Sequence, residues 1–500
     1  MYIYSATDIR AWDEYTILHE PIASIDLMER ASLACAEWLQ QYRQQAESGF
    51  VIFCGKGNNG GDGLAIARLL AETDHPVTVY ILEFGHKGTD DFQTNLARLH
   101  ESKAVIKFIP SEENIPALTA GDIIIDALLG SGLNRPLEGL TAKVVNHINQ
   151  SGLEVIAIDI PSGLMVDSSS AGNTVIKAHH TLSFQCYKLA FLVAENEAFI
   201  GHLHILDIGL HPGYTLEHPA TARWINQALV QSIIKPRKKF SHKGTYGHAA
   251  IIAGSQGMMG AATLSAKACL RSGVGKLTTH IPAVGYTIMQ IAVPEAMTYT
   301  AGKEYIELAV DLEKYDAIGA GPGWGQHDMH KTLLESIFQQ TTKALILDAD
   351  ALNTLAQHQQ LLEQLPRNTI ITPHPKEFER LFGKSANDFE RIQLALKKAA
   401  QFNIIIVLKG RYTLVATPEG HAYFNSTGNP GMATGGSGDV LTGIITGLAA
   451  QGYAPSETAI AGVFLHGLAG DLATAYTSQE SLIASDIVEY LGDAFHQLVV

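Results

Sequence analysis

Short apolar segments alternate with amphipathic stretches through most of the first half of the chain. Uninterrupted apolar runs predict strands buried on both faces, and the amphipathic stretches between them predict helices. Residues 10–43 are expected to be mostly helical with a break near Pro21, and further helices are expected over Gly63–Leu70 and Phe92–His100. This alternation predicts a parallel sheet with helices on both faces. The expected strands are Phe50–Phe53, Val77–Leu82, Val105–Ile109, Asp122–Asp126, Val155–Asp159, Thr181–Phe184 and His204–Ile208.

The alternation stops within Leu210–Lys243, a segment with several prolines and a basic cluster, and starts again at Ala249. We interpret this segment as a crossing between two α/β domains. In the second half, Leu414–Ala416 and Ala422–Phe424 are expected to form a hairpin. The other expected elements are the strands Ala249–Ala253, Lys276–Ile281, Ala317–Gly319, Ala344–Asp348, Thr369–Thr372 and Ile404–Leu408, and the helices Gly438–Ala450 and Ala459–Tyr476.

Charge and cysteine content narrow the class of protein. The 500 residues include 35 Lys and Arg against 50 Asp and Glu, a formal net charge of −15. Such a balance disfavours nonspecific binding to nucleic acid or to an anionic membrane, although backbone N–H groups can still bind phosphate. The cysteines form no CxxC pair and the N-terminus does not resemble a signal peptide, so we expect a reducing, cytoplasmic location. The apolar N-terminal helices favour a homo-oligomer.

Glycine is enriched, at 46 of 500 residues. This share exceeds the usual ~7 %. No Gly-X-Y period or Gly/Ser run accounts for the excess, so we expect it in binding loops that follow strands. The glycine-rich segments concerned are Asn58–Gly63, Gly130–Gly132, Gly254–Gly260, Gly319–Gly325 and Gly428–Gly438.

The segment Asn58-Asn59-Gly60-Gly61-Asp62-Gly63 lies between an expected strand and an expected helix. Glycines there allow the backbone close to a ligand, and a helix N-terminus favours negative charge. The segment has neither the Lys-Ser/Thr of a P-loop nor the GxGxxG spacing of a dinucleotide-binding turn. Because its asparagines and aspartate add oxygen ligands, we predict a binding loop rather than an ordinary turn.

Acidic residues end two of the expected strands. Asp126 and Asp159 reach the carboxyl edge of the sheet, which lines the ligand crevice in open α/β sheets. Oxygens of Asn59, Asp126 and Ser162 could surround one hard monovalent cation. Lys188, just beyond another strand, could pair with Asp159 as an acid/base couple.

The motifs NNGGDG, DALLGSGLNRPL and DIPSGL resemble the N-terminal domain of the NAD(P)H-hydrate epimerase family (YjeF N-terminal type), over roughly residues 5–215. The resemblance implies a Rossmann-like three-layer sandwich that interconverts the R and S epimers of hydrated NAD(P)H. It also implies that Asp159 is an acid/base residue and that Asn59, Asp126 and Ser162 hold K⁺. Gln185-Cys186-Tyr187 precede Lys188, where the family usually has a proline. The implied substrate-binding residues, with Asp159, are Asn58, Asn59, Gly60, Gly61, Asp62, Gly130, Ser131, Gly132, Leu133, Asn134, Arg135 and Pro136.

In the second half, Gly435-Gly436-Ser437-Gly438-Asp439 precedes an expected helix. Successive backbone N–H groups and the helix dipole predict an anion hole, and Asp439 could take a proton from a substrate hydroxyl. Lys409–Thr413 after a strand can supply a nucleotide pocket. His374 and Glu377 follow a strand, as do the motifs Gly321-Pro322-Gly323 and Asp348–Asn353, so a crevice is expected here.

These runs resemble the ribokinase-like superfamily, and more closely the ADP-dependent NAD(P)H-hydrate dehydratase family, over about residues 225–500. Lys243–Gly247, Gly260–Ala262 and Thr372–Pro375 also support the resemblance, whereas Lys376 and Phe378 stand where the family often has Gly and Met. It implies that Ala261, Gly323, His374 and Asp439 contact the hydrated dinucleotide. Mg²⁺ would accompany ADP. The implied ADP-binding residues are Lys409, Gly410, Arg411, Tyr412, Thr413 and Gly438.

Together the two resemblances predict domains at residues 1–215 and 225–500 that form a bifunctional repair enzyme. The first would epimerise hydrated NADH and NADPH, and the second would dehydrate the S form at the expense of ADP, giving AMP and phosphate. One alternative is a kinase of the ribokinase class that phosphorylates a small vitamin-like alcohol. Another is an inactive N-terminal scaffold joined to an active dehydratase.

Overall fold

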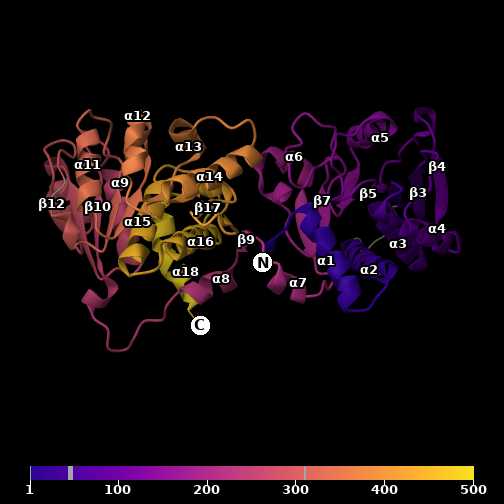
Figure 1. Ribbon diagram of the computed structural model, residues 1–500, viewed down its shortest axis with the longest axis horizontal. Helices are drawn as coiled ribbons and strands as arrows, with labels where there is room; N and C mark the ends of the chain where they lie inside the picture. Colours follow the sequence, from indigo (N-terminus) through magenta and orange to yellow (C-terminus); the bar gives the residue numbers. More distant parts are fainter. Residues whose placement is uncertain (1, 43–48, 309–310, 500) are drawn as a thin grey trace. The chain divides into compact units, whose positions relative to one another are not determined.

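The computed structural model describes residues 2–42, 49–308 and 311–499, which divide into two compact units (Figure 1). One unit holds Tyr2–Ala220 with Asn387–Phe389, and the other holds the rest of the described chain from Thr221 onward. Each unit contains one largely parallel sheet with helices packed against it. The predicted α/β class is therefore confirmed. Among the described residues, no helix is both long and apolar enough to cross a membrane.

The sheet of the N-terminal unit has the strand order β4-β3-β2-β5-β6-β7-β8. All its pairings are parallel, as continuous apolar strands predict. Every strand expected from the sequence is present within two residues. The bounds are β2 Phe50–Cys54, β3 Val77–Leu82, β4 Val105–Ile109, β5 Ile123–Ala127, β6 Glu154–Ile158, β7 His180–Phe184 and β8 His202–Leu206; the short β1 is Tyr2–Ile3.

Helices bury apolar residues against both faces of this sheet. Cys35 and Leu39 of α2, Leu64 of α3 and Phe92 of α4 belong to the core on one face. Val144, Val145 and Ile148 of α5 belong to the core on the other face. The predicted break near Pro21 separates α1 from α2. The bounds are α1 Ala6–His19, α2 Ser24–Tyr42, α3 Asn58–Glu72, α4 Asp90–His100, α5 Gly139–Gln150, α6 Glu197–Ile200 and α7 Gly213–Glu217.

The glycines of Asn58–Gly63 lie inside helix α3 and not in a loop before it, which corrects the expectation. Their role is close packing. A Cβ on Gly60 would lie 1.9 Å from the carbonyl oxygen of Gly55, and one on Gly63 would lie 2.6 Å from Cβ of Ala127. Small residues therefore let the first turns of α3 press against the carboxyl ends of β2 and β5.

We predict that Gly60→Ala destabilises the N-terminal unit by about 1–3 kcal/mol, because the backbone oxygen in its way cannot move aside as a side chain could. Gly57→Ala is the matched control, since a Cβ there meets nothing within 4 Å. Its expected cost is about 0.5 kcal/mol, because glycine caps a helix slightly better than alanine. Hydrogen exchange of peptides from Tyr2–Ala220 during urea unfolding measures the stability of each variant. An equal loss of stability in Gly60→Ala and Gly57→Ala would contradict the packing argument.

The sheet of the C-terminal unit has the order β9-β18-β17-β16-β15-β14-β13-β10-β11-β12. It is parallel except around β17, which pairs antiparallel with both neighbours and confirms the predicted hairpin. The bounds are β9 Ala222–Ile225, β10 His248–Ile252, β11 Lys276–Ile281, β12 Met297–Thr300, β13 Ala317–Ala320, β14 Ala344–Leu347, β15 Ile370–Ile371, β16 Ile405–Leu408, β17 Leu414–Ala416 and β18 Ala422–Asn425.

Two strands of this sheet were not expected. β9 lies within the segment interpreted as a crossing, and it pairs in parallel with β18, far along the chain. β12 is an edge strand with largely exposed side chains, so it lacks the apolar run that marks the others. The helices are α8 Gln227–Ile233, α9 Met259–Arg271, α10 Tyr286–Ala292, α11 His330–Gln340, α12 Ala349–Gln357, α13 Pro375–Phe382, α14 Asp388–Phe402, α15 Ser437–Ala450, α16 Pro455–Thr474, α17 Ala484–Glu489 and α18 Leu491–Leu498.

Candidate functional site

The predicted residues of the N-terminal unit gather at the carboxyl edge of its sheet. Asp126 lies in β5, Asp159 directly follows β6, and Lys188 follows β7. Asn59 comes from the first turn of α3, after β2. Since neighbouring parallel strands end at the same edge, four separate segments deliver polar side chains to one place.

Asp126 and Ser162 form a buried pair. Ser162 Oγ donates to Asp126 Oδ1 over 2.6 Å, and the backbone N–H of Ser162 donates to Oδ2 over 2.8 Å. Neither residue is exposed to solvent. Burial raises the pKa of Asp126 to about 6, and the hydrogen bonds from Ser162 and from the Leu128 backbone oppose that rise. An oxygen-rich, low-dielectric site of this kind favours a bound cation.

Asn59 has an unsatisfied amide at the same edge. The residue is 7 % exposed, and neither its Oδ1 nor its Nδ2 has a hydrogen-bond partner. A Cβ on Gly130 would lie 3.2 Å from Asn59 Cβ and 2.8 Å from Asp159 Oδ2, so glycine allows the backbone to approach both side chains closely. Buried amides are normally paired, and an unpaired one points to a ligand. The residues present fit the predicted cation in their chemistry, because the Asn59 amide, the Asp126 carboxylate and the Ser162 hydroxyl all offer oxygens, which suit a hard cation.

Asp159 and Lys188 form an ion pair with 2.9 Å between Oδ1 and Nζ. Lys188 is fully buried, and its Nζ also donates to Ser183 Oγ over 2.5 Å. The other carboxylate oxygen, Asp159 Oδ2, accepts the backbone N–H of Ser131 over 2.8 Å. Asp159 adopts a left-handed backbone with φ +67°. Such strain is concentrated at functional sites. Lys188 thus reaches Asp159 without the proline that the family usually has before it.

The remaining predicted residues of this unit differ in exposure. Asp62 is buried beside Ser32, and burial together with the charges of Asp159 and Asp13 raises its pKa well above the usual value. Asn58 is exposed, and so is most of the loop after β5. The members of that loop are Gly130, Ser131, Gly132, Leu133, Asn134, Arg135 and Pro136, which lie between β5 and α5.

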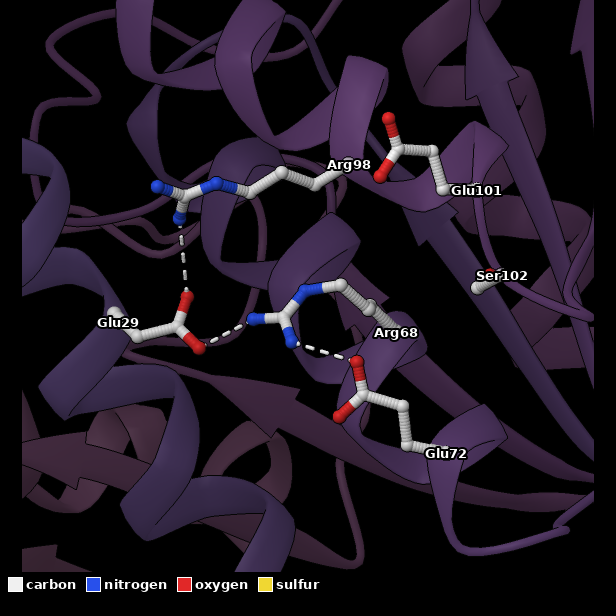
Figure 2. Close-up of a pocket in the computed structure, with 6 residues that line it drawn as sticks. All are labelled: Glu29, Arg68, Glu72, Arg98, Glu101 and Ser102. Atoms are coloured by element: carbon white, nitrogen blue, oxygen red, sulfur yellow. Dashed lines mark hydrogen bonds and ion pairs between the residues drawn. The ribbon is translucent and has the colours of Figure 1, made fainter.

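A surface hollow of about 460 Å³ lies away from these strand ends, between α2, α3 and α4. Figure 2 shows that Glu29 bridges Arg98 and Arg68, and that Arg68 also pairs with Glu72. Each arginine is therefore already neutralised by a carboxylate. We interpret this cluster as an ion-pair network that joins three helices and not as a phosphate site.

In the C-terminal unit, helix α15 begins at Ser437 and its N-cap Gly436 has φ +91°. Backbone N–H groups at a helix start lack intrahelical acceptors and can bind an anion. Helix α16 holds the preceding loop: Asp471 accepts the Gly428 N–H over 2.8 Å and the Asn429 side-chain amide over 2.9 Å. Arg411 donates to the Gly428 carbonyl over 2.7 Å. These contacts fix Gly428 and Asn429, in the loop that leads to the predicted anion hole.

A second buried ion pair lies beside this helix start. Lys409 Nζ lies 2.9 Å from Asp348 Oδ1, and Thr442 Oγ donates to Asp348 Oδ2 over 2.8 Å. A Cβ on Gly438 would lie 3.4 Å from Lys409 Nζ. Burial raises the pKa of Asp439 to about 7; the charge of Asp348 adds to that rise and Lys409 opposes it. A carboxyl group with this pKa suits proton transfer near neutral pH.

His374 and Glu377 form the start of α13. The His374 side chain accepts backbone N–H groups of Lys376 and Glu377, and Glu377 Oε2 accepts the His374 N–H over 2.8 Å. Glu377 Oε2 also lies 4.0 Å from Lys409 Nζ. Burial lowers the pKa of His374, and the positive charge of Lys409 lowers it further. The lowered pKa favours the neutral form of His374, which caps α13 near Lys409.

The structure also brings together the members of two other groups of predicted binding residues. A Cβ on Gly323 would lie 2.9 Å from Ala261 Cβ, so Gly323, in the loop after β13, is a neighbour of Ala261 in the first turn of α9. Gly410 and Thr413 close a tight turn through Thr413 Oγ, which donates to the Gly410 carbonyl over 3.0 Å. Tyr412 in that turn packs against Trp224 with 5.4 Å between ring centroids.

Some residues in these sites were not singled out from the sequence. Thr442 had a usable signal, because it lies one helical turn beyond Asp439. Ser183 lies inside a strand, and Asp13 lies on α1, so no local pattern marked them. Asp13 interacts electrostatically with Asp159 and Lys188.

Comparisons with known proteins match both parts of the chain. Residues 249–492 match the family model described as NAD(P)H-hydrate dehydratase, and residues 24–190 match the model described as YjeF-related protein N-terminus. A ribokinase-like superfamily protein of Enterococcus faecalis V583 has a TM-score of 0.50 at 28 % identity, covering 56 % of this chain and 96 % of that one. The expected ribokinase-like fold of the second half is thereby confirmed.

Similar proteins cover almost the whole chain. A bifunctional NAD(P)H-hydrate repair enzyme of Moorella thermoacetica is 35 % identical over 508 residues, covering 98 % of this chain and 96 % of that protein. The protein of the same description from Coxiella burnetii is 34 % identical and covers 98 % of each chain. The Escherichia coli protein is 32 % identical, covering 98 % of this chain and 93 % of its own. The chain therefore belongs to the family of bifunctional NAD(P)H-hydrate repair enzymes.

Proposed function

We propose that the N-terminal unit interconverts the R and S epimers of hydrated NADH and NADPH, and that the C-terminal unit dehydrates the S epimer. The observation that carries this proposal is the presence of two different proton-transfer sites in one chain. One is the Asp159–Lys188 pair, against which Gly130 packs closely. The other is Asp439 at a glycine-rich helix start. A kinase for a small alcohol would need only the second site.

In the epimerase site, Asp159 accepts or returns a proton of the substrate hydroxyl, and Lys188 positions the carboxylate through their ion pair. The Ser131 N–H fixes the second carboxylate oxygen, which orients the first. Asn59, Asp126 and Ser162 would hold K⁺. When bound, K⁺ supplies fixed positive charge that anchors the substrate loops. The exposed loop Gly130–Pro136 would contact the dinucleotide.

In the dehydratase site, Asp439 takes the proton from the hydroxyl of the hydrated ring. The hydroxyl oxygen then attacks the terminal phosphate of ADP, and AMP leaves. Backbone N–H groups at Gly435–Gly438 stabilise the transferring phosphoryl group. The C–O bond of the phosphate ester breaks next: phosphate leaves with the electron pair, the ring nitrogen supplies electrons, and loss of a ring proton restores NAD(P)H. Phosphorylation thus converts hydroxide into a better leaving group.

The nucleotide would lie along Lys409–Thr413 with its phosphates toward Gly438. Mg²⁺ is usually held by one or two carboxylates together with substrate phosphates. Asp348 and Glu377 offer such carboxylates beside Lys409. Within residues 2–42, 49–308 and 311–499, no group of three or more His, Cys, Asp or Glu could hold a metal ion by itself. Mg²⁺ would therefore enter with ADP, where it neutralises phosphate charge.

We also propose a cytoplasmic location and a homo-oligomer. All four cysteines are buried and free, which suits a reducing compartment. Helices α1 and α2 carry exposed apolar side chains, among them Leu18 at 75 % and Leu33 at 44 % exposure. Apolar surface of this kind supports an interface between copies of the chain.

Absorbance at the nicotinamide band tests the proposed function. Racemic hydrated NADH is mixed with the full chain, ADP and Mg²⁺, and the recovered NADH is measured. Complete recovery faster than spontaneous epimerisation is expected if both sites work. Recovery of half the substrate would show a dehydratase joined to an inactive first unit. A stable phosphorylated product without NADH would instead support the kinase alternative.

A further inference from the structure

Helix α16 comes close to the start of α15, where the phosphoryl group is proposed to bind. Glycines allow this approach: a Cβ on Gly462 would lie 2.7 Å from Ile445 Cγ1 of α15, and one on Gly467 would lie 2.3 Å from Thr427 Oγ. His466 lies between these two glycines in the sequence, and its ring reaches the start of α15.

His466 contacts the first residue of α15 through one ring nitrogen. Its Nε2 lies 3.0 Å from the carbonyl oxygen of Ser437 and 3.2 Å from Ser437 Oγ. Ser437 is 8 % exposed and lies within Gly435–Gly438, the run proposed to stabilise the transferring phosphoryl group. The same ring therefore fixes both the backbone and the side chain of a residue in the predicted anion hole.

The two contacts determine where the hydrogens lie. A carbonyl oxygen can only accept a hydrogen bond, so Nε2 of His466 carries the N–H. Burial lowers the pKa of His466 to about 4; the hydrogen bond with the Ser437 backbone opposes that fall, and the charge of Lys409 adds to it. The ring is therefore neutral near pH 7, with its one hydrogen on Nε2. Because Nε2 then has no free lone pair, Ser437 Oγ accepts a share of this N–H and cannot donate to it.

The hydroxyl hydrogen of Ser437 is left for another acceptor. Within residues 2–42, 49–308 and 311–499, Ser437 Oγ has no hydrogen-bond partner other than His466. A serine inside a helix can donate to a carbonyl one turn earlier, but Ser437 is the first residue of its helix. A Cβ on the next residue, Gly438, would lie 3.4 Å from Lys409 Nζ, so a cation lies beside the same helix start. A phosphoryl oxygen is the acceptor that the proposed reaction brings to this place.

We propose that His466 is a positioning residue of the dehydratase site, which orients the Ser437 hydroxyl so that it donates its hydrogen to the terminal phosphoryl group of ADP. Ser437 itself is then a catalytic residue, because this hydrogen bond strengthens as negative charge develops on the phosphoryl oxygens. The inference rests on the proposed dehydratase function, and it adds a side-chain donor to the backbone N–H groups of the anion hole.

Recovery of NADH from the purified S epimer, with ADP and Mg²⁺, measures this role in the full chain. Ser437→Ala removes the hydroxyl, and we expect kcat to fall by about 10²-fold, as for the loss of one donor to a developing oxyanion. His466→Leu leaves the hydroxyl unoriented, and we expect a fall of about tenfold, with KM for the S epimer nearly unchanged. His466→Gln keeps an N–H donor and should stay within about threefold of the original rate. His496→Leu, exposed on α18, is the matched control and should keep the full rate.

A double-mutant cycle separates positioning from support of the fold. If His466 acts through Ser437 Oγ, His466→Leu and Ser437→Ala together lower kcat by less than the product of their separate losses. Losses that multiply would show two independent effects and overturn the inference. An unchanged kcat in His466→Leu would also overturn it, and so would an equal loss in His466→Gln, since the N–H would then have no role. Should His466→Leu fail to fold, Ser437→Ala decides alone, because a full rate without the hydroxyl contradicts the inference.

Failure of the proposed function gives a different result. If the unmodified chain restores no NADH and releases no AMP from ADP, the C-terminal unit is not an ADP-dependent dehydratase. If the unmodified chain restores NADH and Ser437→Ala does so at the same rate, the dehydratase function stands and only the role of His466 and Ser437 fails.

Discussion

Replacing Asp439 with asparagine is expected to lower the ADP-dependent dehydration of the S epimer by about 10²- to 10⁴-fold. The variant keeps the shape of the side chain at the start of α15 but removes the only group we assign as base for the substrate hydroxyl. Because substrate and ADP still bind to the surrounding loops, kcat should fall while KM for ADP changes little. Absorbance recovery from pure S epimer with ADP and Mg²⁺ measures the effect.

The pH profile gives a second measure of the same role. Burial and the charge of Asp348 raise the pKa of Asp439 from the usual 3.8 to about 7. Asp439 must be deprotonated to act as a base, so kcat/KM should rise with pH up to about 7 and then level off. Asp493→Asn, on exposed surface of the same unit, is the control and should leave rate and profile unchanged. An Asp439→Asn variant with full activity would remove Asp439 from the mechanism.

Lys188→Met is expected to give the largest loss of stability. Lys188 is fully buried, and its removal leaves Asp159 charged and unpaired in the interior. Breaking a buried ion pair in this way typically costs about 3–5 kcal/mol. Epimerisation should be lost as well, because the ion pair that positions the Asp159 carboxylate is gone. Hydrogen exchange of Tyr2–Ala220 in urea measures the stability, and conversion of S to R without ADP measures the activity.

An exposed pair of the same composition is the matched control. Lys103 and Asp74 lie 2.6 Å apart with side chains 81 % and 80 % exposed. Water and salt screen such a pair, so Lys103→Met should change neither stability nor activity measurably. Adding Asp159→Asn to Lys188→Met should recover part of the lost stability, since the uncompensated charge is then gone. If Lys188→Met and Lys103→Met unfold at the same urea concentration, the buried Lys188–Asp159 pair does not stabilise the N-terminal unit as predicted.

Strand positions were largely predictable because many of the inner strands are buried on both faces. Val77–Leu82, Lys276–Ile281 and Leu414–Ala416 coincide with the expected ranges, since a largely buried strand is marked by its own apolar run. Two strands lacked that local signal. β12 is an exposed edge, and β9 becomes a strand only because β18 pairs with it.

The candidate-site residues that lie at the ends of strands could be predicted from the sequence. Asp126, Asp159 and Lys188 each follow or end a strand, and the ends of neighbouring parallel strands meet at one edge. The helical position of Gly60 was not predictable, because glycine has a low helix propensity and its value there is close packing. A glycine in a sequence shows where the backbone is free to bend. It does not show which other segment packs against that glycine in the folded protein.

The sequence by itself determined the two α/β units, the strand ends and the residue types that could transfer protons or hold an ion. Only the tertiary structure decided which of these groups face one another. It paired Lys188 with both Asp159 and Ser183, and it linked Lys409 to Asp348. The physical reason is that local apolar periodicity specifies strands and helices. Partners distant in the chain are selected by packing and by the cost of burying an unpaired charge.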